Sequence, residues 1–166
     1  QETACVMWLC LGNAEFAPYL PYYASAITET PVICTLDAPD YSEYSMYWAN
    51  RSLSTISATN RTLYGNKIKA FYSEYENALI ENMSVLDAQM EKSITKSHTA
   101  NILCKNVAYD GFNKSKALYG ELIKFIALYE GEDETKGNKL QFELKTKPEI
   151  EPIPSYSVSG PTIISN

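Results

Sequence analysis

Histidine and arginine are scarce in this sequence. The 166 residues include one histidine, His98, and two arginines, Arg51 and Arg61. One histidine leaves few ways to build a Ser–His–Asp or Cys–His catalytic group, and there is neither a G-x-S-x-G turn nor a glycine-rich phosphate loop. We therefore predict a protein that is not an enzyme and needs no cofactor.

Basic clusters and long apolar runs are also missing. The net charge is −6 and the twelve lysines are dispersed, whereas nucleic-acid binding needs a clustered basic face. The longest apolar stretch, Ala117 to Tyr129, is interrupted by Glu121 and Lys124 and is too short to span a bilayer. We expect neither a nucleic-acid partner nor an integral membrane segment.

Four cysteines are present without a C-x-x-C pair: Cys5, Cys10, Cys34 and Cys104. An even number in this arrangement favours two disulfides, with Cys10–Cys34 and Cys5–Cys104 as the preferred pairing. Disulfides and a first residue other than Met predict an exported protein without its signal peptide, which is secreted, at the cell surface or periplasmic. Four buried free thiols in a cytosolic protein are the alternative.

Four N-x-[ST] sequons mark candidate N-glycosylation sites, at Asn50, Asn60, Asn82 and Asn113. Such sites require a cell that glycosylates asparagine and an exposed side chain.

Apolar periodicity predicts a mainly α fold, a helical bundle built on a long central amphipathic helix. That helix is expected from Asn66 to Leu103, with a break near Lys96–Thr99, because apolar residues recur in steps of three and four at Ile68, Tyr72, Tyr75, Leu79, Met83, Leu86, Met90 and Ile94. Further helices are expected at 40–64, with Asp40 as N-cap and Glu43 as its partner, and at 112–130, after a turn at Asp110-Gly111.

Short extended segments are expected at both ends of the bundle. Residues 4–11 form a helix or a strand, 19–28 a short helix and 31–36 an extended segment, while Leu140, Phe142 and Leu144 alternate as in a strand. A single disulfide-pinned domain covers 1–147, and a proline-rich extended tail covers 148–166.

The N-terminal third resembles a known family. Ala4 to Leu11 contains a Cys-x4-Cys opening, Ala17 to Tyr23 is an aromatic segment beside Pro18, and Cys34 follows. This pattern is similar to the start of the TrbM-type periplasmic proteins of bacterial conjugative transfer, over about 35 residues. Ala17 departs from that family, which often has a cysteine beside the proline. The resemblance implies an extracytoplasmic role in a secretion assembly.

These features together favour an exported, non-enzymatic structural or adhesive component of a surface, pilus or filament assembly. Its partners are other protein subunits or copies of itself, contacted through Tyr19, Tyr22, Tyr23, Ile163 and Ile164. The alternative is a monomeric carrier whose apolar cavity is lined by Tyr72, Tyr75, Met83 and Met90, residues that are otherwise ordinary core.

Overall fold

A computed structural model describes residues 5–36, 40–130 and 142–150 of the protein, without the side chains of 129 and 130. Along these residues the elements are β1 (Val6–Leu9), β2 (Leu20–Tyr23), a 3-10 turn η1 (Val32–Cys34), α1 (Met46–Thr59), a π-helical turn η2 (Arg61–Gly65), α2 (Asn66–Lys92) and α3 (Lys96–Glu130). The predicted mainly helical class is confirmed, with a short two-stranded antiparallel sheet at the N-terminal end.

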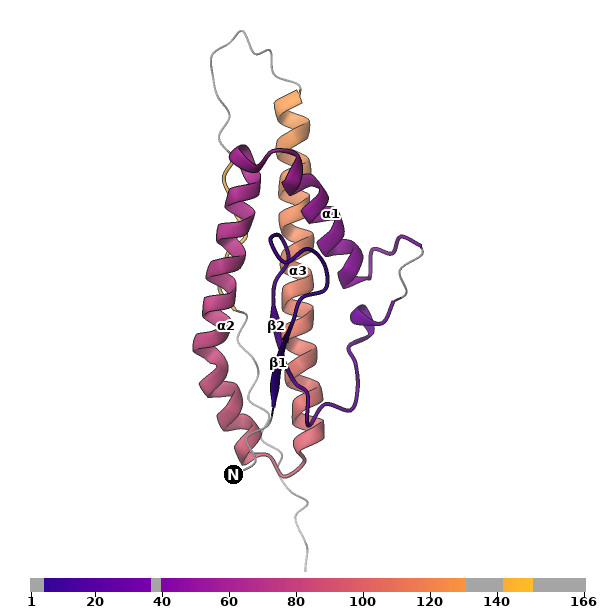
Figure 1. Ribbon diagram of the computed structural model, residues 1–166, viewed down its shortest axis with the longest axis vertical. Coiled ribbons are helices and arrows are strands. Elements are labelled where there is room, and N and C mark those ends of the chain that lie inside the picture. Colours follow the sequence, from indigo (N-terminus) through magenta and orange to yellow (C-terminus); the bar gives the residue numbers. More distant parts are fainter. Residues whose placement is uncertain (1–4, 37–39, 131–141, 151–166) are drawn as a thin grey trace, which may run out of the picture.

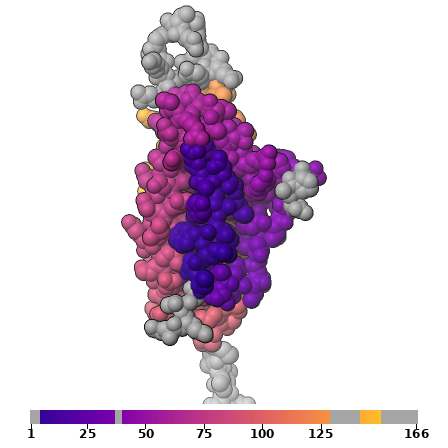
Figure 2. All heavy atoms as spheres, in the orientation of Figure 1, coloured from indigo at the N-terminus to yellow at the C-terminus, as the bar shows by residue number. Residues whose placement is uncertain are grey.

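The two long helices lie side by side and run in opposite directions (Figure 1). α1 packs against α3, and the β1–β2 hairpin lies along α3 and α2. Figure 2 shows the hairpin on one face of the molecule, between α2 and the segment that leads to α1. A single core collects apolar side chains from all of these elements.

The apolar seam of α2 is confirmed over most of its length. Of the eight predicted members, six are buried and Met83 is partly buried. The last one, Ile94, is 83% exposed because it lies in the turn between two helices. The helix predicted over 66–103 is interrupted, but the break lies at 93–95 rather than at Lys96–Thr99, which belongs to the first turn of α3.

Local bonds explain this break. Ser93 has an extended backbone with ψ of 131°, which ends α2. Lys96 Nζ donates to the carbonyl oxygens of Met90 at 2.5 Å and Glu91 at 3.1 Å. The Met90 carbonyl also accepts from Ser93 N at 3.3 Å. Carbonyls at a helix C-terminus lack the usual i+4 partner, and a cation is favoured there.

The predicted turn at Asp110-Gly111 is wrong, because α3 continues through both residues. Gly111 serves close packing instead: a Cβ atom there would lie 3.1 Å from both methyl carbons of Leu20. The glycine lets β2 approach the helix, which the sequence alone does not reveal.

The N-terminal segment is a hairpin, so the predicted short helix over 19–28 is wrong. β1 pairs antiparallel with β2, with Val6 opposite Tyr23 and Leu9 opposite Leu20. All four residues of β2 are buried, since the strand lies between β1 and α3. The expected extended segment at 31–36 contains the 3-10 turn η1.

Two other predicted boundaries are corrected. α1 begins at Met46 rather than after Asp40, because Tyr44 N bonds to Ser42 Oγ at 3.3 Å and keeps the preceding residues in turns. No strand forms within 142–150. There the backbone N–H groups of Lys145 and Thr146 donate to the carboxylate of Glu121, at 2.7 and 2.8 Å, rather than to a neighbouring strand.

Residues 142–150 pack along the helices. Phe142 is buried against the rings of Tyr64 and Phe125, and its carbonyl accepts a hydrogen bond from Lys67 Nζ. Leu140 and most of the predicted 148–166 tail lie outside the described residues. None of the helices described is both long and apolar enough to cross a membrane.

The neighbouring residues Leu79 and Ile80 test the assignment of the core. Leu79 is fully buried and Ile80 is 57% exposed, both on α2. We expect Leu79→Ala to lower the free energy of unfolding by about 3 kcal/mol, because it leaves a cavity in the core. Ile80→Ala is the matched control and should change it by less than about 1 kcal/mol. Urea unfolding followed by circular dichroism measures the free energy of unfolding of both variants. Equal decreases in the two variants would contradict the orientation of α2.

Candidate functional site

A chain of buried hydrogen bonds crosses the centre of the molecule. Asn50 Nδ2, on α1, donates to the carbonyl of Leu11 at 2.6 Å, and Ser115 Oγ, on α3, lies 2.7 Å from Asn50 Oδ1. Tyr72 OH, on α2, lies 2.8 Å from the same Ser115 oxygen. We call these three side chains the Asn50–Ser115–Tyr72 network. It ties the loop after β1 to all three helices.

The loop between the two strands packs closely against Asn50 of this network. Gly12 has φ of +137°, a conformation that side chains disfavour, and a Cβ atom there would lie 3.1 Å from Asn50 Cβ. The neighbouring Cys10 Sγ lies 3.6 Å from the carbonyl oxygen of Ala17. Burial raises the pKa of the Cys10 thiol, and the negative charge of Glu76 raises it further.

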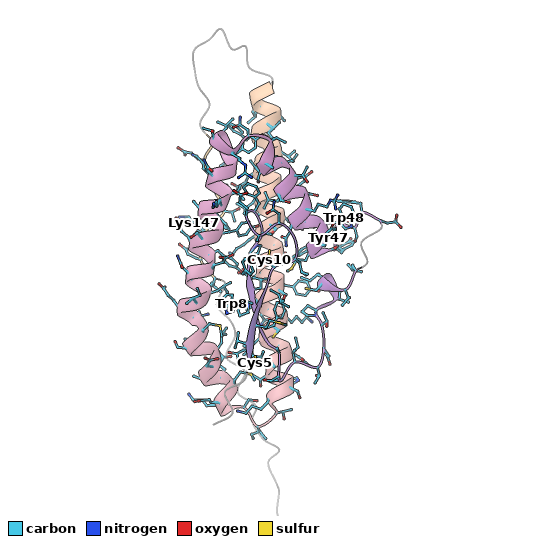
Figure 3. The ribbon with its side chains drawn as sticks, in the orientation of Figure 1. Cys5, Trp8, Cys10, Tyr47, Trp48 and Lys147 are labelled. Atoms are coloured by element: carbon cyan, nitrogen blue, oxygen red, sulfur yellow. The ribbon has the colours of Figure 1, made fainter. Side chains whose placement is uncertain are left out.

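A second polar group lies one turn away on α3. Tyr75 OH donates to Asp110 at 2.8 Å, and Lys114 Nζ lies 3.5 Å from the other oxygen of that carboxylate. Lys114 also stacks over the Tyr75 ring and donates to the carbonyl of Lys147 at 3.3 Å. The lysine and aspartate side chains are only 9% and 10% exposed, so this ion pair holds residues 142–150 against the helices. Figure 3 shows Lys147 beside α2.

The buried tyrosines of this centre stay protonated at neutral pH. Burial is the main cause that raises the pKa of Tyr72 and Tyr75, and the Asp110 carboxylate adds to the shift at Tyr75. A nucleophile is activated by a lowered pKa or by an adjacent base. The centre therefore has the chemistry of a structural connection rather than of an attacking group.

The structure does not form the predicted disulfides, and its four cysteines are free thiols. Cys5 is exposed directly before β1 and Cys104 is buried on α3. Cys34 Sγ lies 3.9 Å from Tyr22 OH. Burial raises the pKa of both the Cys34 and Cys104 thiols.

The candidate glycosylation sites differ in accessibility. Asn60 and Asn113 are exposed and Asn82 is partly buried, so glycosylation there stays a prediction. Asn50 is 1% exposed and bonded within the network. The fold leaves no room for a glycan on it.

Of the three predicted contact residues that the structure describes, Tyr19 alone reaches the surface, at 40% exposure. Tyr22 and Tyr23 are core residues, and Tyr23 OH donates to Asp87 at 2.7 Å. These two are unavailable to another subunit, because β2 faces the helices. Ile163 and Ile164 lie outside the described residues.

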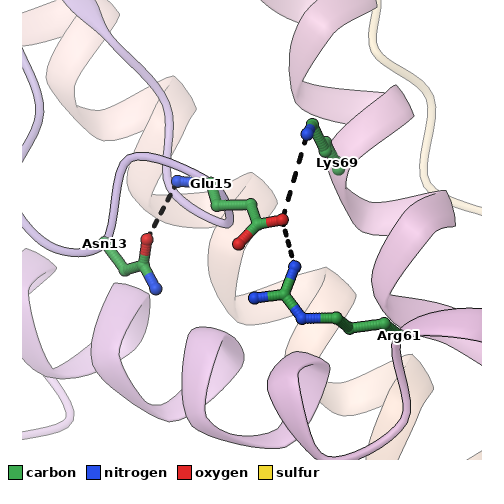
Figure 4. Close-up of polar contacts among 4 residues, drawn as sticks. All are labelled: Asn13, Glu15, Arg61 and Lys69. Atoms are coloured by element: carbon green, nitrogen blue, oxygen red, sulfur yellow. Dashed lines mark hydrogen bonds and ion pairs between the residues drawn. The ribbon is translucent and has the colours of Figure 1, made fainter.

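A cluster of ion pairs at the surface connects the hairpin loop to η2 and α2 (Figure 4). The Glu15 carboxylate pairs with Arg61 and lies 3.9 Å from Lys69 Nζ, and Glu15 N donates to Asn13 Oδ1 at 3.0 Å. The hydrogen bond from Arg61 holds the pKa of Glu15 below its usual value. The group is open to solvent, so its contribution to stability is small.

The network was not predicted from the sequence, where Asn50 and Ser115 belong to N-x-[ST] sequons. Helical spacing contains a usable indication: Asn50 lies on the face of Met46 and Leu53, and Ser115 on that of Leu118 and Leu122. A polar residue within an apolar face needs a buried partner. His98, by contrast, is exposed in the first turn of α3.

Comparison with known proteins relates the chain to peptidases. The model of the family "Peptidase family C69" matches residues 1–74. The chain is 24% identical over 131 residues to the probable dipeptidase B of Streptococcus pyogenes serotype M1, covering 74% of this chain and 26% of that protein. The probable dipeptidase B of the serotype M3 strain ATCC BAA-595 / MGAS315 is also 24% identical, over 127 residues, which are 72% of this chain and 25% of the relative. The chain thus spans about a quarter of the length of these relatives.

These similarities overturn the prediction of a non-enzymatic structural component of a pilus or filament assembly, and the carrier alternative with it. That prediction depended on the absence of a complete catalytic motif from the sequence. The lack of such a motif carries little weight, because the chain spans only about a quarter of the length of these relatives.

Ser115 tests the network. We expect Ser115→Ala to lower the free energy of unfolding by about 2 kcal/mol, because Asn50 and Tyr72 lose a buried partner. The exposed Ser73 on α2 provides the control, and Ser73→Ala should change stability by less than about 0.5 kcal/mol. Urea unfolding measures both variants. A Ser115→Ala protein as stable as the control would show that the network contributes nothing.

Thiol titration tests the state of the cysteines. Protein unfolded in guanidinium without reductant should give four thiols per chain with Ellman's reagent. In the folded protein we expect the exposed Cys5 to react first and the buried Cys104 last, with Cys5→Ser and Cys104→Ser identifying each phase. The predicted pair of disulfides would instead give no thiols after unfolding.

Proposed function

We propose that this protein takes part in peptide-bond hydrolysis as a dipeptidase related to the C69 family. The observation that carries the proposal is the family match over residues 1–74. The similarity to the streptococcal dipeptidases extends over 74% of the chain. In the reaction, water adds across the bond of a dipeptide and releases two amino acids.

The matched segment is a continuous part of the fold. It includes the hairpin, η1, α1, η2 and the first turns of α2, and the Asn50–Ser115–Tyr72 network fastens it to α3. A site built on such a segment has a rigid base. Rigid support is what a peptidase needs, because a reacting bond must be held within a fraction of an ångström.

In this proposal the described helices position a substrate rather than attack it. Burial raises the pKa of the thiols of Cys10, Cys34 and Cys104, so they are protonated at neutral pH and are weak nucleophiles. Their role is to fill the interior around the hairpin.

Dipeptide hydrolysis by protein from its native source tests the proposal. Amino acids released from a panel of unblocked dipeptides are derivatised and quantified by chromatography. We expect release from the unmodified protein and at least a tenfold lower rate for Asn50→Ala, which removes the tie between α1 and the Leu11 loop.

Asn77→Ala, at an exposed position of α2, is purified in parallel and should keep the full rate. Circular dichroism confirms that the unmodified protein is folded. Folded protein that leaves every dipeptide intact would overturn the proposal, and so would equal rates in both variants, which indicate a contaminating peptidase.

A further inference from the structure

A pocket of about 160 Å³ opens between α1, the loop before it and the middle of α3. Aromatic side chains from all three segments contribute to its wall: Tyr41, Trp48 and Tyr119. Polar side chains also line it, among them Ser52, Glu43 and Lys116. Figure 3 shows Trp48 near the start of α1, beside Tyr47. None of the residues that line the pocket belongs to the Asn50–Ser115–Tyr72 network.

Its aromatic wall suits one ring. The Tyr41 and Trp48 rings meet edge to face, with centroids 5.8 Å apart, and Tyr41 is 69% exposed. Aromatic pairs add such contacts readily. A pocket of this volume is below the size of usual drug-like sites and accommodates a single side chain.

The indole N–H of Trp48 is covered and has no acceptor among the described residues. That nitrogen is covered by protein atoms, so Trp48 contributes the apolar part of its ring to the pocket wall and not a hydrogen-bond donor. Arg51 lies over the outer part of the Trp48 ring, 5.4 Å from its centroid, and donates to Tyr47 OH at 2.5 Å, which fixes the indole in place.

Two opposite charges line the same pocket. Lys116 Nζ donates to the backbone carbonyl of Glu43 at 3.3 Å, which uses one of its three protons. No carboxylate lies within ion-pair distance of this ammonium in the described part of the chain. The Glu43 carboxylate is exposed and, over the same residues, pairs with no cation.

We propose that this pocket binds a free aromatic amino acid. The ring packs against Tyr41, Trp48 and Tyr119, the ligand's carboxylate pairs with Lys116, and its ammonium pairs with Glu43. An uncharged apolar molecule would form no ion pair with Lys116 or Glu43. A purely anionic molecule would be repelled by the Glu43 carboxylate. The choice of an amino acid rests on the proposed function, because dipeptide hydrolysis releases one.

Trp48 provides a direct readout. The protein has two tryptophans, and Trp8→Phe leaves Trp48 as the only indole. L-phenylalanine should change the Trp48 emission with saturation at millimolar concentration. N-acetylphenylalanine, which lacks the ammonium, and phenylalaninamide, which lacks the carboxylate, should each bind about five- to tenfold more weakly. Equal affinity for all three, or no change in emission, would overturn the proposal.

Charge variants in the Trp8→Phe background assign the two contacts. Lys116→Met should weaken phenylalanine binding about fivefold or more, and Glu43→Gln should do the same. Exposed residues give matched controls, Lys124→Met on α3 and Glu74→Gln on α2, and these should bind as the parent does. Parent-like binding by Lys116→Met would remove the carboxylate contact and overturn the proposal.

The readout is binding and not turnover, so the two proposals fail separately. Loss of the fluorescence response in a protein that still hydrolyses dipeptides would overturn the pocket alone. A normal response in a protein that hydrolyses nothing would overturn the proposed function and keep the pocket.

Discussion

The hydrogen bond between Asn50 and Ser115 is the contact on which the arrangement of the elements depends. It joins α1 to α3 at 2.7 Å, and the same side chains reach the Leu11 carbonyl and Tyr72 OH. A buried polar group without its hydrogen-bond partner lowers stability by about 1–3 kcal/mol. Sliding either helix by one turn would leave several such groups without partners at once. Apolar packing alone tolerates such shifts more easily. The network therefore specifies one register for four segments that are far apart in the sequence.

Much of the helical fold could be predicted from the sequence, because local periodicity determines it. The seam from Ile68 to Met90 is buried as its spacing indicates.

The wrong predictions occur where contacts between residues distant in the sequence determine the local structure. Asp110-Gly111 has the composition of a turn, yet the contact with Leu20 keeps it in α3. Residues 19–28 lack strand alternation because both faces of β2 are covered. Asp40 is a sound N-cap by type, but the bond between Tyr44 and Ser42 delays the helix to Met46.

The candidate sites were less predictable, for two physical reasons. The network consists of common Asn, Ser and Tyr residues, and only their proximity in the fold shows that they form hydrogen bonds with one another. Two of its members lie in sequons, a pattern that predicts exposed positions. The pocket combines residues 41–52 with Lys116 and Tyr119, which no local pattern connects. Function was inferred wrongly for a related reason. The prediction depended on the absence of a complete catalytic motif, whereas the similarity to the dipeptidases is spread over 74% of the chain at 24% identity.

The buried network and the surface pocket are also coupled by helix geometry. Ala49 lines the pocket and precedes Asn50, while Lys116 lines it and follows Ser115. One residue on a helix turns the side chain by about 100°, so the step from Asn50 to Ala49, or from Ser115 to Lys116, leads from the interior to the pocket. The interior holds the Lys114–Asp110 ion pair and neutral groups whose pKa is raised by burial, and the charges of Lys116 and Glu43 lie at the pocket. The bond that fixes α1 on α3 thus also sets the separation of Trp48 and Lys116, on which the proposed recognition of an amino acid depends.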